Sequence, residues 1–231
     1  MALVIGGSGV VGRAVVSGLA AKQVPTCFTY CANRAVADEL AQRTGARAEQ
    51  LDLRDGDALG ALFASLDRDG VAPDVLVHAA AVNPRAGLLE LTRDEWQTAV
   101  AVNATSALVA CQEVGRRATA GADIVLLTAL DRTQSLPIPA AFAATQGLIT
   151  ALAMGAARDL GARGVRINVV ALGPLGAGIS QSLPGAILDD FRTYSALRRA
   201  GTAAEAAAPI LWLALENTYM NGKVMPVNGG V

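Results

Sequence analysis

The chain has 231 residues, which is long enough for one α/β domain with a full hydrophobic core and short for two. Its 19 basic and 20 acidic side chains leave a formal charge of −1, which argues against nucleic acid or an anionic membrane as a partner and favours small molecules or proteins. Only 17% of the residues are charged and 52% are hydrophobic, so we expect some helices to be covered by other subunits of an oligomer.

Short aliphatic runs alternate with Ala-rich amphipathic stretches along the whole chain, which is the rhythm of βαβ units. Strands are expected at 2–5, 26–30, 46–53, 74–80, 123–129, 165–172 and 223–228, and helices near 11–22, 34–45, 57–70, 94–117, 142–160 and 202–215. We therefore predict an α/β fold: a single-domain Rossmann-type, doubly wound parallel sheet of about seven strands over residues 1–231, with helices on both faces. Residues 173–201 are rich in Gly, Pro and Ser and too long for an ordinary connection, which predicts a substrate loop or lid.

The cysteines indicate a reduced, cytoplasmic protein without a metal site. Cys27, Cys31 and Cys111 are odd in number and lack metal-ligand spacing. On one strand, Cys27 and Cys31 would lie roughly 13 Å apart, too far for a disulfide. The first residues lack a basic start and reach glycine early, which indicates neither a signal peptide nor a membrane span.

Residues 7–12 read GSGVVG and fit the pattern G-x-G-x-x-G between the first strand and the first helix. Gly7 and Gly9 would permit a tight turn and the close approach of a diphosphate, and Gly12 would let the helix pack closely on the strand. Ser8 and Val11 complete this candidate phosphate loop, and the helix N-terminus would offer N–H groups to the phosphates. The context predicts dinucleotide binding.

The end of the second strand favours NADP(H) over NAD(H). An acidic residue there would bind an unphosphorylated ribose, but the sequence continues as Asn33 and Arg34. A cation at this place suits a 2′-phosphate. The alternative is that Arg34 is solvated at a helix start.

Further segments match one known family over the entire length. They are ALVIGGSGVVGRA, QLDL, DVLVHAAAV, WQTAVAVNATSAL, VRINVVALGP, RRAGTAAEAAAPILWLA and NGKVMPVNGG. With them, the chain resembles the short-chain dehydrogenases/reductases, most closely their β-ketoacyl-ACP reductase branch. The resemblance implies Asp52 and Leu53 near the adenine, and Ala79 and Ala80 beside the cofactor. It also implies tetramers that pair the helices at 90–115 and 142–160.

The family reduces carbonyls with an Asn, Ser, Tyr, Lys constellation, in which Tyr and Lys form Y-x-x-x-K and Ser lies 13 residues before Tyr. Here those positions hold Asn103, Ala129, Phe142 and Gln146, so only the Asn is retained. In the family, the Tyr protonates the alkoxide as the hydride arrives, and the Lys lowers the pKa of the Tyr and holds the ribose. A lost general acid costs roughly 10²–10⁴ in rate and a lost oxyanion donor about 10²–10³ more, so ordinary ketone reduction would be slow.

Two further departures concern the cofactor. Val10 fills the family's middle-glycine position, and Ala177 stands where the family has a Thr that holds the nicotinamide amide. Binding of NADP(H) is therefore expected to be weakened, lost, or kept only at the adenine half.

Several other side chains are candidates for the missing proton donor. Thr128 adjoins Ala129, but successive strand residues face opposite sides, so its hydroxyl should point away. Thr145 would supply a hydrogen bond but is a poor acid. Asp131, Arg132 and Gln134 follow the fifth strand and would reach the pocket mouth.

Two more candidates lie elsewhere in the chain. His78 closes the fourth strand as an acid or base, or as a residue that hydrogen-bonds the backbone. Tyr194 in the lid is either a replacement acid or a packing residue.

Three interpretations stay open, and with them whether the chain is an enzyme. The first is a non-catalytic or weakly active binding or scaffold subunit in a fatty-acid-like or polyketide-type pathway. It would form a homo-oligomer (dimer or tetramer) or a hetero-oligomer with an active family member, and meet a substrate bound to acyl carrier protein. The second is an NADPH-dependent 3-oxoacyl thioester ketoreductase with a rewired proton donor, such as Tyr194, Asp131 or a water chain. The third is a non-redox dehydratase, cyclase or isomerase that uses the same pocket.

Overall fold

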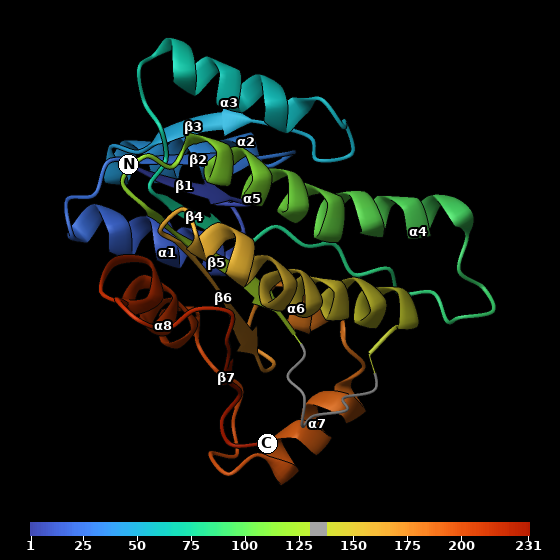
Figure 1. The fold of residues 1–231 in the computed structure, drawn as a ribbon. Helices are drawn as coiled ribbons and strands as arrows, with labels where there is room; N and C mark the ends of the chain where they lie inside the picture. Colours follow the sequence, from blue (N-terminus) through green and yellow to red (C-terminus); the bar gives the residue numbers. More distant parts are fainter. Residues whose placement is uncertain (130–137) are drawn as a thin grey trace.

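The computed structural model of the chain describes residues 1–129 and 138–231. In these ranges seven parallel strands form one sheet in the order β3-β2-β1-β4-β5-β6-β7 (Figure 1). The strands are β1 (Ala2–Ile5), β2 (Thr26–Tyr30), β3 (Arg47–Gln50), β4 (Val75–His78), β5 (Ala122–Thr128), β6 (Val165–Leu172) and β7 (Val224–Val227). The predicted fold class is confirmed.

Helices cover both faces of the sheet. The helical elements are α1 (Val10–Ala21), α2 (Arg34–Thr44), α3 (Ala58–Arg68), α4 (Arg93–Ala99), a π-helical turn η1 (Val100–Thr105), α5 (Ser106–Arg117), α6 (Ala140–Gly161), a 3₁₀ turn η2 (Gly178–Ser182), α7 (Gly185–Tyr194) and α8 (Ala203–Leu215). Residues of α3, α5 and α6 form one hydrophobic cluster with the sheet, and residues of α1, α2 and α8 form the other.

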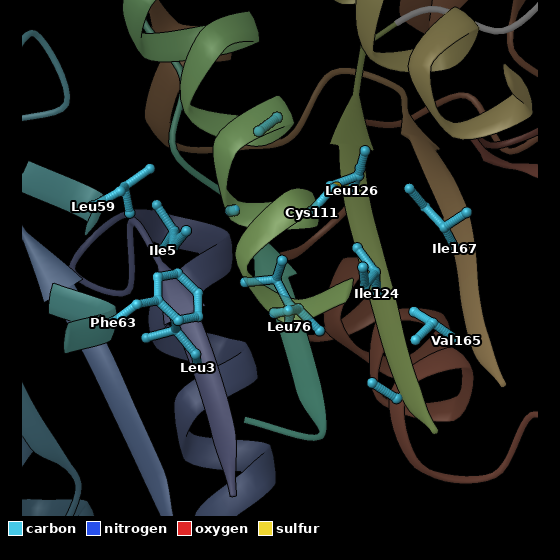
Figure 2. Packing of buried hydrophobic residues seen from close by; sticks show 14 of the residues in the cluster. Leu3, Ile5, Leu59, Phe63, Leu76, Cys111, Ile124, Leu126, Val165 and Ile167 are labelled. Carbon is cyan, nitrogen blue, oxygen red and sulfur yellow. The ribbon is translucent and has the colours of Figure 1, made fainter. Parts of the chain in front are cut away.

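The central strands are buried on both faces, which is why their sequences are continuous apolar runs rather than alternating ones. All four residues of β1 are fully buried. On one face, Leu3 and Ile5 lie against Leu59 and Phe63 of α3 (Figure 2). The strand order reverses between β1 and β4, and in such sheets the ligand crevice lies at the carboxyl ends of the strands at this point.

The structure corrects two of the predicted elements. The helix expected over 94–117 is interrupted by the π turn η1, which contains Asn103. Residues 173–201 are not simply a loop, because η2 and α7 lie within them. The Gly, Pro and Ser content of this segment hides α7, whose apolar face buries Phe191.

Helix α6 begins at Ala140, two residues before the predicted start, because Pro139 fixes an extended backbone at its N-cap. This helix was expected to be paired with another subunit, and in the single chain Leu148 and Met154 are 42% and 43% exposed. By length and composition alone, α6 is the one described helix that would cross a membrane. Here its other face packs on the sheet through Ile149 and Ala153.

Candidate functional site

A cavity of about 670 Å³ lies at the carboxyl ends of the strands, where the topology predicts it. It is bounded by the turn after β1, the ends of β2 to β6, the N-terminus of α6, and the segment 172–183. Ten of the residues predicted from the sequence line it: Ser8, Gly9, Val11, Asp52, Leu53, Ala79, Ala80, Ala129, Phe142 and Gln146. Gly7, Gly12, Asn33, Arg34 and Asn103 are not among its lining residues.

The positive φ that the tight turn after β1 requires is at Gly6 rather than at Gly7. Gly6 has a φ of +81°, and a Cβ there would lie 2.6 Å from the backbone nitrogen of Ala80. Gly7 instead packs under Phe28, and its N–H donates to the carbonyl of Thr29 at 2.8 Å. Gly7 therefore lies in the turn as predicted, but the residue with the left-handed backbone is Gly6, which the pattern did not single out.

In the rest of the loop, Gly12 still lets the helix approach the turn closely. The middle position, where the family has a glycine, is filled by the side chain of Val10. A Cβ on Gly12 would lie 2.2 Å from the carbonyl oxygen of Gly6, so only glycine fits. Val10 begins α1, lines the cavity, and its side chain faces Gly178 of η2, where an added Cβ would lie 3.1 Å from Val10 Cγ2. The isopropyl group thus fills space beside the phosphate loop.

One end of the cavity, at the end of β3, carries its charged groups. Arg54 binds Asp52 with its guanidinium, with Nε 3.0 Å from both carboxylate oxygens, and its own N–H also donates to Asp52. The Arg54 guanidinium lowers the pKa of Asp52 to about 2. Arg13 of α1 also lines the cavity. We call this region the β3 end.

Asn33 and Arg34 do not reach the cavity. The Asn33 side chain caps α2 by accepting from the N–H of Val36 at 3.4 Å. The Arg34 side chain is 75% exposed and lies 3.8 Å from Asp38 on its own helix. The solvated alternative for Arg34 agrees with this structure, and among the described residues the cations that line the cavity are Arg13 and Arg54.

The opposite end of the cavity, which we call the β5 end, is lined by Val82, Asn83, Ala129, Phe142 and Gln146. The three substituted positions of the family's relay therefore do come together. Gln146 is 3% exposed, and its Oε1 accepts from the backbone N–H of Ala129 at 2.9 Å. The Phe142 ring is also buried. None of the described residues that line this end is a Tyr, His, Lys, Asp or Glu.

Asn103 lies behind this wall and braces it. From the π turn, its Oδ1 accepts from the N–H of Val82 at 2.8 Å, and its Nδ2 donates to the Val82 carbonyl at 2.9 Å. Nδ2 also donates to Thr145 Oγ1 at 2.9 Å. The residue that the sequence retains is thus a structural tie between the β4 loop and α6. π turns are frequent where a helix must aim a side chain at a functional site.

The predicted substitutes for the proton donor are held elsewhere. The Thr145 hydroxyl accepts from Asn103 and contacts the carbonyls of Ala141 and Phe142 within α6. The Thr128 hydroxyl donates to the main-chain carbonyl of Gln146 at 3.2 Å. Tyr194 is 76% exposed and does not line the cavity. Asp131, Arg132 and Gln134 lie outside the described residues.

His78 is a buried histidine whose side-chain partner is Ser106. It is 2% exposed, and Nε2 lies 2.7 Å from Ser106 Oγ. Ser106 donates its own proton to the carbonyl of Val102 at 2.7 Å, so it accepts from His78 and the proton of the ring is on Nε2. Burial lowers the pKa of His78 to about 4, which keeps the ring neutral.

A parallel sheet of this order with a glycine turn at its switch point is the Rossmann-type arrangement of dinucleotide-binding proteins. Residues 7–231 match the family described as enoyl-(acyl carrier protein) reductase. The chain belongs to the short-chain dehydrogenase/reductase family.

Two named relatives and one solved structure are similar to the chain over nearly its whole length. The cyclic-di-GMP-binding biofilm dispersal mediator protein of Escherichia coli K12 is 30% identical over 98% of this chain and 94% of its own length. The 3-oxoacyl-[acyl-carrier-protein] reductase MabA of Mycobacterium bovis is 26% identical over 99% of this chain and 91% of its own. The crystal structure of BdcA in complex with NADPH superposes with a TM-score of 0.90 at 30% identity, over 99% of this chain and 92% of that one. The chain is therefore similar both to ketoacyl-ACP reductases and to an NADPH-binding member of the family.

Proposed function

We propose that this protein is an NADP(H)-binding member of the family that is non-catalytic or only weakly active in ketone reduction, and that it acts as a binding or scaffold subunit. The observation that carries the proposal is the β5 end of the cavity. Ala129, Phe142 and Gln146 line one wall there, and the Gln146 carbonyl is bonded to the Ala129 main chain. The three positions that hold Ser, Tyr and Lys in the family still meet on one wall here, but they hold Ala129, Phe142 and Gln146 instead.

The residues present suit a dinucleotide. Gly6 and Gly12 form a cradle that any Cβ would fill, next to the free N–H groups at the start of α1. Arg13 and Arg54 line the cavity and are the cations that a 2′-phosphate would meet among the described lining residues, with Arg54 paired to Asp52. The Val10 side chain narrows the phosphate loop and Ala177 offers no side-chain hydrogen bond, so the affinity is expected to be lower than a glycine and a threonine would give.

The side chains at the β5 end explain why ketone reduction is expected to be slow. A bound NADPH would supply a hydride, but the alkoxide formed on a ketone needs a proton in the same step. Phe142 has none to give, and the hydroxyls of Thr128 and Thr145 are held by α6. Losing the general acid alone lowers the rate by roughly 10²–10⁴. The cavity can still hold a ligand, orient it and exclude water.

An oligomer is part of the proposal. From Ala140 to Gly155 the exposed residues of α6 are small ones together with Leu148 and Met154, an apolar face that a second subunit would cover, and the charged Arg158 and Asp159 follow it. We infer a dimer or tetramer of this chain, or a pairing with an active family member. A cytoplasmic place beside fatty-acid-like or polyketide-type enzymes, and an acyl-carrier-protein-bound substrate, follow from the likeness to ketoacyl-ACP reductases.

The test is a titration of the purified protein with NADPH by fluorescence, followed by a reduction assay with a β-ketoacyl thioester. NADPH is expected to bind, and the unmutated protein to oxidise it at a rate near the uncatalysed one. The triple variant Ala129→Ser, Phe142→Tyr, Gln146→Lys is expected to gain ketoreduction, and Ala129→Ser alone, which lacks the acid, is the matched control. Ordinary turnover by the unmutated protein would contradict the proposal.

The oligomer is tested separately by light scattering after gel filtration. Leu148→Lys is expected to shift the protein toward the monomer, whereas Tyr219→Lys, at an exposed position outside the two helices expected to pair, serves as a comparison. A monomeric unmutated protein, alone and when mixed with an active reductase of the family, would contradict this part.

A further inference from the structure

The segment that follows β6 is fixed at its base by main-chain hydrogen bonds. Gly173 donates to the carbonyl of Val227 at 3.0 Å, and Gly176 donates to the carbonyl of Gly201 at 3.0 Å. Beyond Gly176, the main chain of residues 177–183 bonds only within its own segment, among the residues that the structure describes. We call residues 177–183 the lid tip.

The first contact that joins the lid tip to the rest of the fold is apolar and comes from Val10. Gly178 has a φ of +74°, and a Cβ there would lie 3.1 Å from Val10 Cγ2 and 3.3 Å from Val10 Cβ. The backbone of Gly178 therefore lies against the isopropyl group at the start of α1, and both residues line the cavity. A glycine at position 10, as the related enzymes have, would offer no side chain for this contact.

The second contact is a long hydrogen bond at the β5 end of the cavity. Asn83 Nδ2 donates to Ser182 Oγ at 3.4 Å. Ser182 donates its own proton to the carbonyl of Ile179 at 2.7 Å, so it accepts from Asn83. Among the described residues, this is the one hydrogen bond from the lid tip to another part of the fold.

Two weak contacts of this kind hold a segment closed and still let it open. The lid tip contains a single 3₁₀ turn, and such short turns with few bonds open far more often than a buried sheet does. The lid tip lines the cavity together with Val10 and Asn83, so it spans the space between the two places that hold it. A ligand that passes this side of the cavity has to displace it.

We propose that Val10 and Asn83 act as a two-point latch that holds the lid tip across the cavity, so that a ligand enters or leaves when the latch opens. The two residues are positioning residues, and the device sets the rate of ligand exchange rather than the affinity. This role rests on the proposed function, since the ligand is taken to be a nicotinamide dinucleotide. The latch contacts themselves can be tested without any ligand.

The first experiment measures amide hydrogen exchange in a peptide that covers residues 175–183. Val10→Ala and Asn83→Ala each remove one contact and are expected to speed exchange there about fivefold. Val11→Ala, the same truncation one residue along and packed against the core cluster of β1 and β2, is the matched control and is expected to leave this peptide unchanged. The peptide over α7 reports in each variant whether the neighbouring fold is intact.

The second experiment measures NADPH binding by stopped-flow fluorescence. Ser182→Ala is the variant of choice because Ser182 does not line the cavity, whereas Val10 also borders the phosphate loop. It is expected to raise the association and dissociation rate constants together, by about fivefold each, and to leave the Kd within about twofold.

The outcomes separate the latch from the proposed function. Unchanged exchange of residues 175–183 in Val10→Ala or Asn83→Ala overturns the latch, and so does equal acceleration in Val11→Ala. Unchanged NADPH rate constants in Ser182→Ala overturn the role in ligand exchange. Failure of the unmutated protein to bind NADPH overturns the proposed function and this role with it, while the exchange experiment still decides whether the latch exists.

Discussion

Lowering the pH from 7 to 5 is expected to destabilise the fold through His78, although this residue lies outside the cavity. The ring is buried and neutral, and burial lowers its pKa from the ordinary 6.5 to about 4. Because the folded-state pKa lies below the unfolded one, the stabilising contribution is complete above about pH 6.5 and is lost as the pH falls toward 4. Linkage of these two values gives a loss of about 2 kcal/mol between pH 7 and pH 5.

The measurement is urea unfolding at several pH values and one protein concentration, followed by the fluorescence of Trp96 and Trp212. Other groups titrate in the same range, so the comparison is with His78→Asn, which cannot gain a proton there. The unmutated protein is expected to lose about 2 kcal/mol more than the variant over these two pH units. Parallel losses in both proteins would refute the assignment of His78 as a buried neutral residue.

Three further predictions concern the backbone and the phosphate loop. Gly6→Ala is expected to cost more than about 2 kcal/mol in urea unfolding because of its positive φ and the nearby Ala80 backbone, whereas Gly60→Ala on open α3 should stabilise by about 0.5–1 kcal/mol. Thr202→Ala removes the capping box of α8 and should cost about 1 kcal/mol, whereas Thr193→Ala near the end of α7 should stay within about 0.5 kcal/mol. Val10→Gly should tighten NADPH about fivefold in a titration, and unchanged affinity would show that the isopropyl group does not obstruct the loop.

The architecture was predictable because local patterns decide it. Buried parallel strands read as continuous apolar runs, and 165–172 and 26–30 were placed to the residue. Helix ends were less certain, since α6 depends on the backbone of Pro139. Helix α7 was missed because the Gly, Pro and Ser residues of the segment around it are typical of a loop and hide a short amphipathic stretch.

The candidate site was predictable in its list of substituted positions and not in its contacts. The resemblance to the family and the spacing of its motif located Ala129, Phe142 and Gln146, and in the structure all three line one cavity. Arg13 was absent from the prediction because a helical position gives no hint of what it faces. The hydrogen bond of Asn83 reaches Ser182, 99 residues away, and no local pattern encodes such a contact.

The brace built by Asn103 separates the frame of the pocket from its reacting groups. Its bonds to Val82 and Thr145 hold the loop and the helix together without involving any of the three substituted positions. Those positions can therefore change without disturbing the frame. The pocket's shape and its chemistry are therefore set by different residues, so the proposed loss of activity would not require any loss of the fold that encloses the ligand.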